Sequence, residues 1–160
     1  MRRKKKIRIL GIDPGLKNTG YGVIDKSRRG PEYIDSGVVR TSTDGDFPKR
    51  LNKIYNGVSE VIKNSKPDAI SIEETIYAQN YQIAIKLGHA RGVAILAASN
   101  SDLDIFEYAP KKIKSSITGN GRAKKKQLQF MVKSILDLKT MPKSFDESDA
   151  IAAAICHLNQ

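Results

Sequence analysis

The stretch RILGIDPGLKNTGYGVID, residues 8–25, decides the fold class of this chain. Residues 7–12 form a short apolar run, which is long enough for a buried strand and too short for most helices. Asp13 interrupts this run, Pro14 and Gly15 stop it, and a second apolar run follows at residues 20–24. We therefore expect two antiparallel strands joined by a turn at residues 14–19.

Asp13 lies at the end of the first expected strand, where a carboxylate is costly to remove from water. A bound metal ion would compensate that cost. The alternative is that Asp13 caps the turn by accepting hydrogen bonds from nearby backbone N–H groups. This stretch alone leaves both interpretations open, and three carboxylates further along the chain favour the first.

The rest of the chain alternates between strand-like and helix-like spacing of apolar residues. Strand patterns follow at residues 32–40, 68–72 and 103–108. Helical patterns follow at residues 47–65, 80–99, 123–138 and 146–157, with a shorter one beginning at Pro110. The first three strands form an antiparallel meander, and the fourth, which comes after a helix, can pair parallel with the first. This order predicts a single α/β domain, residues 1–160, with a mixed five-stranded sheet flanked by helices.

The composition favours a polyanionic partner. The chain has 160 residues and a net charge of +11, from 28 basic and 17 acidic residues. Such an excess suits nucleic acid first and an anionic membrane surface second. The basic residues cluster at residues 1–6, where we expect a flexible extension, and at residues 111–114 and 122–126.

The sequence also bounds the cellular setting. No run approaches the roughly 18 apolar residues that a membrane-spanning helix needs, so we expect no membrane partner. The basic N-terminus lacks the apolar core of a signal peptide. The single cysteine, Cys156, excludes an internal disulfide and fits a reducing, cytoplasmic location.

Four carboxylates lie at the ends of expected elements. Asp13 and Glu73 follow strands, and Asp146 and Asp149 share one face at the start of the last helix. Parallel neighbouring strands would bring the first two to the same edge of the sheet. Such oxygen ligands suit Mg²⁺ or Mn²⁺, and two ions about 4 Å apart could assist water attack on a phosphodiester. The alternatives are helix-start acids favoured by the macrodipole, and a surface role for Glu73, with which Glu74 competes.

Five segments of the chain resemble the RuvC family of Holliday-junction resolvases. They are GIDPGLKNTGYGVI, SIEETIYAQN, KLGHARGVAILAA, ITGNGRAKKKQ and FDESDAIAAAICH, in one consistent order over residues 8–157. The first segment alone would be weak, since actin-like ATPases and sugar kinases carry similar turns. A kinase of that type would need a second phosphate loop and a longer chain.

The resemblance implies an RNase H-like fold, a homodimer, and cleavage of a four-way DNA junction by paired symmetric nicks in recombination and repair. It also implies a site of four acids that binds two Mg²⁺ or Mn²⁺ ions and leaves 5′-phosphate and 3′-hydroxyl ends. Carried over by motif, these acids are Asp13, Glu73, Asp146 and Asp149, and Glu73 is preferred over Glu74. The branch-migration complex of RuvA and RuvB is the partner that the family implies.

Basic residues flank the Gly-Asn-Gly turn at residues 119–121 and form the expected DNA-binding surface. Phosphate contacts of this kind set affinity without reading sequence, and the alternative is a solvated basic face. By resemblance, Lys114 and Lys125 lie near the scissile phosphate. The other members of the expected surface are Lys112, Arg122 and Lys124.

A loop after Glu73 carries, in the family, an aromatic residue that stacks on unpaired bases. This chain departs from that pattern, because Ile76 occupies the aromatic position. We expect Tyr77 to substitute, with ordinary packing as the alternative. We expect structural or surface roles for His89 and His157, each of which is alone on its helix.

The helix expected at residues 80–99 is the best candidate for a dimer contact. Small residues and an apolar stripe lie along it, and the alternative is a stripe that faces only the sheet. The remaining alternatives are an RNase H-like nuclease with another substrate, such as a flap, a fork or RNA, and a non-catalytic junction binder. Four clustered acids disfavour the binder, which has no use for negative charge that faces phosphate.

Overall fold

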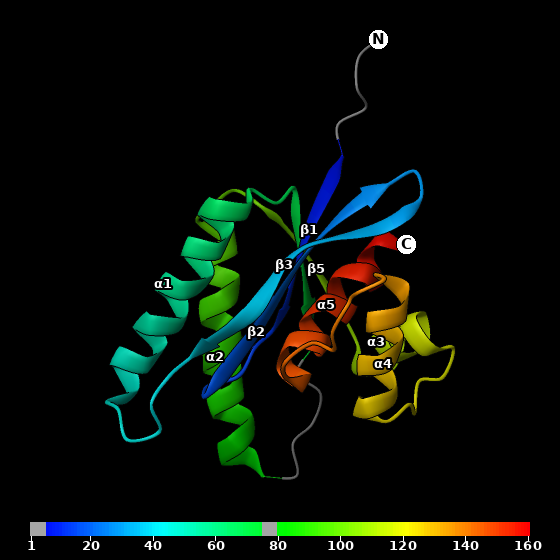
Figure 1. Ribbon diagram of the computed structural model, residues 1–160. Coiled ribbons are helices and arrows are strands. Elements are labelled where there is room, and N and C mark those ends of the chain that lie inside the picture. Colours follow the sequence, from blue (N-terminus) through cyan, green and yellow to red (C-terminus); the bar gives the residue numbers. More distant parts are fainter. Residues whose placement is uncertain (1–5, 75–79) are drawn as a thin grey trace.

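The computed structural model describes residues 6–74 and 80–160 and contains the expected strands and helices (Figure 1). The strands are β1 (Ile7–Asp13), β2 (Asn18–Ser27), β3 (Gly30–Arg40), β4 (Ala69–Glu73) and β5 (Asp104–Tyr108). The helices are α1 (Phe47–Ser65), α2 (Tyr81–Ser99), α3 (Pro110–Thr118), α4 (Lys125–Ile135) and α5 (Phe145–Leu158). Tyr77 and Ile76 lie outside the described residues.

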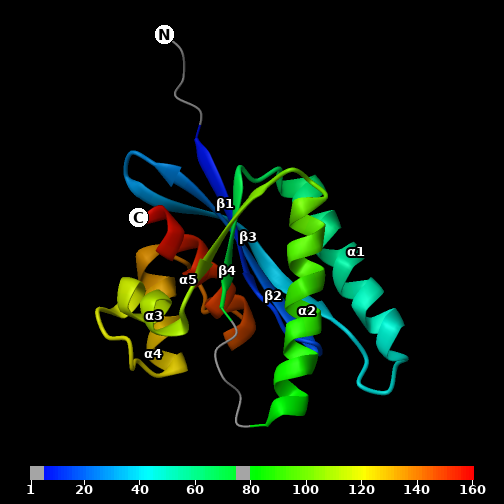
Figure 2. The ribbon, with the colours of Figure 1, turned by 180° about the vertical axis from the view of Figure 1, so that it is seen from behind.

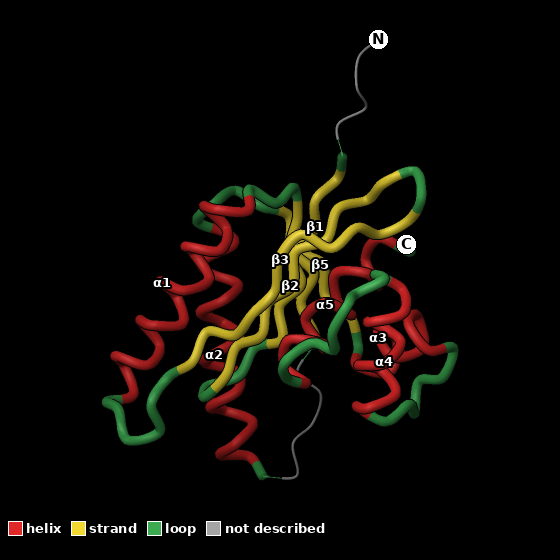
Figure 3. Tube along the Cα trace, viewed as in Figure 1, coloured by secondary structure: helices red, strands yellow, loops and turns green. Residues whose placement is uncertain are grey.

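The five strands form one mixed sheet in the order β3-β2-β1-β4-β5. The β1–β2 and β2–β3 pairs are antiparallel, which confirms the meander. The β1–β4 and β4–β5 pairs are parallel, so the fourth strand pairs with the first as predicted. The chain reaches β4 and β5 through helices because parallel neighbours need a crossover connection. Figure 3 shows the sheet running through the middle of the molecule, with helices on both sides.

Each face of the sheet carries its own hydrophobic core. Helices α1 and α2 cover one face, and α3, α4 and α5 cover the other (Figure 1, Figure 2). Successive residues of a strand point to opposite faces, so Ile9 packs into the α5 side while Leu10 and Ile12 pack into the α1–α2 side. By the same alternation, Asp13 emerges on the face that α5 covers.

Helix α5 lies unusually close to the sheet because the strands beneath it carry glycine. A Cβ atom at Gly11 would lie 1.9 Å from the backbone oxygen of Ala150, and one at Gly20 would lie 2.0 Å from the backbone oxygen of Asp146. Atoms cannot approach so closely, so any residue with a Cβ atom at either position would force α5 away from the sheet. The alanine-rich middle of α5 is fully buried against the same strands. The close approach therefore fixes the height of α5, and of its acids, above the sheet.

The bounds of β2 and α4 differ most from the sequence-based expectation. Strand β2 extends beyond residues 20–24 at both ends, because Asn18 pairs with Arg40 and Ser27 pairs with Gly30 across the meander. Helix α4 ends at Ile135 rather than at residue 138. Asp137 adopts a left-handed backbone, with a φ of 49°, which stops a helix.

The apolar stripe of α2 divides between two environments. Ala90, Ala94 and Ala97 are buried in the core against the sheet, while Ile83 near the start of the helix is exposed. The second half of the stripe therefore faces the sheet, which was the alternative to a dimer contact. None of the helices that the structure describes is long and apolar enough to span a membrane.

Candidate active site

The four predicted acids lie at one end of the sheet. Asp13 is the last residue of β1 and Glu73 is the last residue of β4. Their preceding residues, Ile12 and Ile72, are register partners in the parallel pair, so the two acids leave the sheet side by side. Asp146 lies in the first turn of α5, which packs over this edge.

A pocket of about 310 Å³ opens between these elements. Three of the predicted acids, Asp13, Glu73 and Asp146, line it together with Glu74. Asn18 and Leu87 also line the pocket; nothing in the sequence pattern had singled them out. The lining residues are Asp13, Pro14, Gly15, Asn18, Glu73, Glu74, Leu87, Pro110, Lys125 and Asp146.

The carboxylates of this cluster repel one another. Burial raises the pKa of Asp13 to about 8, and the charges of Glu73, Asp149 and Asp146 add to the effect. Burial and the charge of Asp149 raise the pKa of Glu73 to about 7, although Lys125 and Lys114 oppose the shift. The two lysines do not fully offset the cost of ionising these carboxyl groups, which a cation among them would lower further.

Asp149 belongs to the same electrostatic cluster, one helical turn after Asp146. Burial raises the pKa of Asp149, and the nearby ammonium group of Lys125 lowers it in part. Burial in turn lowers the pKa of Lys125, but attraction to Asp149 and the hydrogen bond between them outweigh it, so that the pKa of the lysine is raised. The Lys125 Nζ atom lies 3.4 Å from Asp149 Oδ2.

The donor set fits a hard divalent cation. Carboxylate oxygens are the ligands that Mg²⁺ and Mn²⁺ prefer, and the crowding of negative charge is what such an ion relieves. Within residues 6–74 and 80–160, no three acidic, histidine or cysteine side chains already stand in a closed metal-binding arrangement.

The two histidines lie apart from this pocket. His157 Nδ1 is hydrogen-bonded to the Tyr108 hydroxyl at 2.7 Å, and its ring stacks at 4.3 Å on Phe106. His89 Nδ1 lies 2.7 Å from the backbone oxygen of Ile85 on its own helix. Both contacts are structural, in line with the expectation from the sequence.

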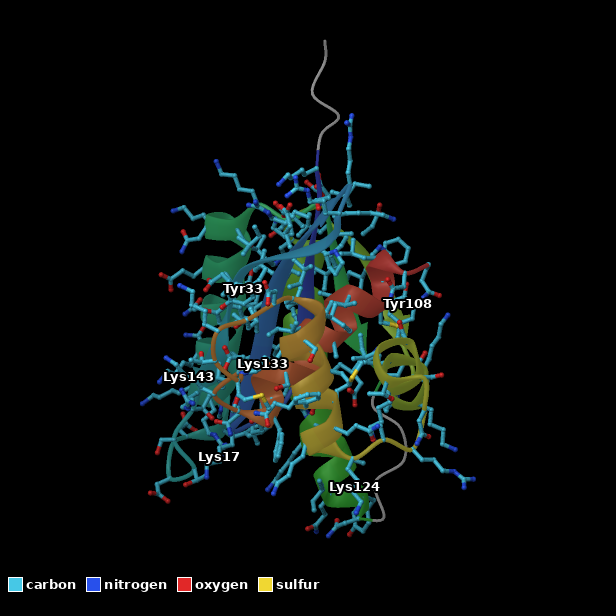
Figure 4. All side chains as sticks on the ribbon, turned by 45° about the vertical axis from the view of Figure 1, so that its right-hand side comes forward. Lys17, Tyr33, Tyr108, Lys124, Lys133 and Lys143 are labelled. Atoms are coloured by element: carbon cyan, nitrogen blue, oxygen red, sulfur yellow. The ribbon has the colours of Figure 1, made fainter. Side chains whose placement is uncertain are left out.

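The structure brings two of the expected DNA-binding residues to the acids. These are Lys125, which contacts Asp149, and Lys114, whose charge acts on Glu73. Lys112 instead lies with its Nζ atom 5.2 Å above the Tyr108 ring. Arg122 and Lys124 are exposed around the start of α4, and Lys124 projects at the lower end of the molecule in Figure 4.

A second basic rim, on the α1–α2 side of the site, was missed in the sequence. A pocket of about 400 Å³ adjoins the acidic pocket and shares Asp146 with it. Lys17, Arg50 and Lys86 line this pocket. They come from three separate segments of the chain, so no single run of charge marked them together. Basic side chains therefore line both of the pockets that meet at Asp146. Figure 4 shows Lys17 at the same lower end of the molecule as Lys124.

Comparison with known proteins agrees with this architecture. The family model described as crossover junction endodeoxyribonuclease RuvC matches residues 9–157. The protein of that name from Proteus mirabilis is 53% identical over 154 residues, which cover 95% of this chain and 88% of the relative. The one from Shewanella woodyi is 49% identical over 151 residues, which cover 94% of this chain and 86% of the relative.

Solved structures show the same likeness. The T. thermophilus RuvC in complex with Holliday junction substrate superimposes with a TM-score of 0.89 at 31% identity, covering 95% of this chain and 93% of that one. The yeast mitochondrial Holliday junction resolvase Ydc2, at a TM-score of 0.68 and 15% identity, covers 94% of this chain and 77% of its own length, and shares the fold alone. The fold is RNase H-like, and the chain belongs to the RuvC family of crossover junction endodeoxyribonucleases.

Proposed function

We propose that this chain is a metal-dependent endonuclease that resolves four-way DNA junctions by paired, symmetric nicks. The observation that carries the proposal is the convergence of four acids at one sheet edge, with basic side chains on both sides of them. A protein with a net charge of +11 that gathers negative charge at one point has a use for a cation there. Membership of the RuvC family supplies the substrate class.

Asp13, Glu73, Asp146 and Asp149 are the residues that would hold the metal. Two Mg²⁺ ions, or Mn²⁺ in their place, would supply an activated water and stabilise the leaving oxygen, which gives 5′-phosphate and 3′-hydroxyl ends. The protein contributes the position of these carboxylates: the ends of β1 and β4 fix one pair, and the packing of α5 on glycine fixes the other.

The lysines act on the phosphate backbone. Lys125 and Lys114 stand beside the acids, where their charges can offset the approach of a polyanion to a negative pocket. Lys112, Lys124 and Arg122 extend this positive surface from α3 to the start of α4, and they set affinity and register rather than sequence preference. Tyr77, which lies outside the described residues, remains our proposal for the side chain that stacks on bases.

A homodimer fits both the substrate and one surface of the protein. A two-fold dimer presents two equal sites to the two like strands of a junction. The outer face of α2, with Leu51 of α1, forms an apolar hollow of about 430 Å³. Ile85 and Leu96 on this face are 55% and 51% exposed, and the bare Gly88 and Gly92 between them allow close approach. We assign the dimer contact to this outer face rather than to the stripe that faces the sheet.

The wider setting follows from family membership. We infer one nuclease domain that acts in the bacterial cytoplasm, on nucleoid DNA, together with the branch-migration complex of RuvA and RuvB. The bacterial relatives support this inference.

The decisive experiment measures binding and cleavage separately on a synthetic immobile four-way junction and on linear duplex. We expect the wild-type protein to nick opposing strands of the junction only with Mg²⁺ or Mn²⁺. Asp13→Asn should bind the junction and not cut it. Asp44→Asn, the same change at an exposed loop residue, serves as the matched control and should cut normally. If the wild-type protein binds the junction but does not cut it with either metal, the protein is a junction binder and not a nuclease. If it cuts linear duplex or RNA as readily as the junction, the substrate assignment is wrong.

A further inference from the structure

Glu147 has an unusual place among the acids of α5. Ser144 is the residue that caps the helix, and its hydroxyl oxygen accepts a hydrogen bond from the Glu147 backbone N–H at 3.2 Å. A serine followed three residues later by glutamate is the capping-box pattern, in which the glutamate side chain normally reaches back to the cap residue. Here the side chain reaches one residue further and accepts from the backbone N–H of Lys143 at 2.8 Å.

The second oxygen of the same carboxylate is tied to the sheet. The Ser36 hydroxyl of β3 donates to Glu147 Oε1 at 2.5 Å. Because the Ser36 hydrogen is committed to Glu147, the Tyr33 hydroxyl, 2.9 Å from Ser36 Oγ, must donate to Ser36. One carboxylate thus joins three segments: strand β3, the loop before α5, and the first turn of α5. Figure 4 shows Tyr33 and Lys143 on the same side of the molecule, where this connection lies.

Glu147 points away from the acidic pocket. It lines a different hollow, of about 260 Å³, together with Tyr33, Ser36 and the loop at residues 138–143, whereas Asp146 lines the pocket with Asp13 and Glu73. Glu147 is only 7% exposed, and it forms no ion pair with any lysine or arginine that the structure describes. A buried carboxylate is tolerated when hydrogen bonds replace its water, and the donors from Ser36 and Lys143 do so here.

Helix geometry connects this tie to the acids. Asp146 precedes Glu147, and its backbone oxygen already rests against Gly20 of β2, the register partner of Asp13. Adjacent helical residues point about 100° apart. The Gly20 contact and the Ser36 hydrogen bond therefore hold the first turn of α5 from two directions. They fix both its height above the sheet and its rotation about its own axis.

We propose that Glu147 is a positioning residue for the metal site. It acts through Asp146 and Asp149, whose orientation it fixes, and it touches neither metal nor DNA. A displacement of about 1 Å in a catalytic group can reduce rates by as much as 10²-fold, so a rigid first turn matters more here than at an ordinary helix start. This inference rests on the proposed function for its activity readout and has a separate readout in metal binding.

The test compares Glu147→Ala, Glu147→Gln and Ser36→Ala with a matched control. Ser71→Ala is that control, because the buried Ser71 hydroxyl donates to the backbone oxygen of Ala153 on the same helix at 2.6 Å, two turns beyond Asp146 and outside the first turn that Glu147 holds. Mn²⁺ affinity of the DNA-free protein is measured by electron paramagnetic resonance titration. Junction affinity without metal, kcat for cleavage, and thermal stability without metal are measured in parallel.

We expect Glu147→Ala to weaken Mn²⁺ binding and lower kcat, each by about tenfold, with junction affinity unchanged. Ser36→Ala should follow in the same direction with a smaller effect. Glu147→Gln should restore both values to near wild type, because its amide oxygen can accept from Lys143 while its amide nitrogen donates to Ser36. Ser71→Ala should lose stability and keep wild-type metal affinity.

Two outcomes would overturn the inference: unchanged metal affinity in both Glu147→Ala and Ser36→Ala, or the same loss in Ser71→Ala. Either would make Glu147 a stabilising residue only. Failure of the wild-type protein to cut the junction would instead contradict the proposed function. In that case, the Mn²⁺ affinities of the wild type, Glu147→Ala, Ser36→Ala and Ser71→Ala, compared with one another, still decide whether Glu147 positions the acids.

Discussion

Replacing Asp13 with asparagine should stabilise the metal-free protein at alkaline pH while it removes the activity. Burial and three neighbouring carboxylates raise the pKa of Asp13 from 3.8 to about 8. An acid whose pKa is higher in the folded than in the unfolded state opposes folding once it must ionise. The penalty is absent below about pH 4, grows as the pH rises, and is complete above about pH 8. Asparagine has no proton to lose and avoids it.

The size of the effect follows from the same pKa. A tenfold change in proton affinity is worth about 1.4 kcal/mol, so the raised pKa sets an upper limit of about 6 kcal/mol at high pH. Side-chain rotation and entry of water into the open pocket reduce this cost. We expect Asp13→Asn to gain about 2 kcal/mol at pH 8, or roughly 4–8 °C in Tm for a chain of this size, and almost nothing at pH 4.5.

Thermal unfolding followed by circular dichroism, in chelator and at several pH values, measures this difference. Asp25→Asn is the control, because Asp25 pairs with Arg8 (Nε to Oδ1, 2.6 Å) and its loss should destabilise the fold. Added Mg²⁺ should raise the Tm of the wild type more than that of Asp13→Asn, since a ligand stabilises the state that binds it. Equal stability of the two proteins at pH 8, or an equal gain at pH 4.5, would show that burial and the neighbouring carboxylates do not raise the pKa of Asp13 as described.

Three further predictions concern separate surfaces. Lys125→Ala should weaken junction binding, measured by gel shift, and lower kcat, measured by single-turnover cleavage, because the charge of Lys125 lies beside the acids. Lys53→Ala on α1 removes the same charge at an exposed position and serves as the control. An equal effect of both variants would mean that only net charge matters. Leu96→Glu should convert the dimer into monomers, as measured by light scattering. Ile7→Glu is the control, because Ile7 is similarly exposed (50%) but lies outside the assigned contact, and this variant should stay dimeric. A dimer that survives Leu96→Glu would refute the assigned contact. Ser144→Ala should cost about 1 kcal/mol in urea unfolding through loss of the helix cap, and no change would mean that another group replaces it.

The architecture was predictable from the sequence because its signals are local. Apolar runs punctuated by proline and glycine marked the strands, and helical spacing marked the helices between them. The ends of β1 and β4 then placed Asp13 beside Glu73 through a single topological inference, that the fourth strand pairs parallel with the first. The RuvC resemblance added the choice of Glu73 over Glu74, which spacing alone left open.

What escaped the sequence were contacts between distant segments. Lys17 and Lys86 reach the site from a turn and a helix far apart in the chain, and no pattern in the sequence links them. The bond between Ser36 and Glu147 joins residues 111 positions apart. A capping-box spacing was visible at Ser144, but it predicts a bond to the cap residue rather than to a strand. Such contacts depend on the register of packed elements, which composition and periodicity do not encode.

The close approach of α5 to the sheet has a consequence for how this protein can change. A single added methyl group at Gly11 or Gly20 would meet backbone rather than a movable side chain, so the helix itself would have to lift. Lifting it would carry Asp146 away from Asp13. Gly11 and Gly20 have no chemical function, yet a change of either to alanine should impair activity by displacing α5 and the acids that it carries. A survey of tolerated mutations should therefore find glycine positions beneath α5, as well as the four acids, among the positions where substitution removes activity.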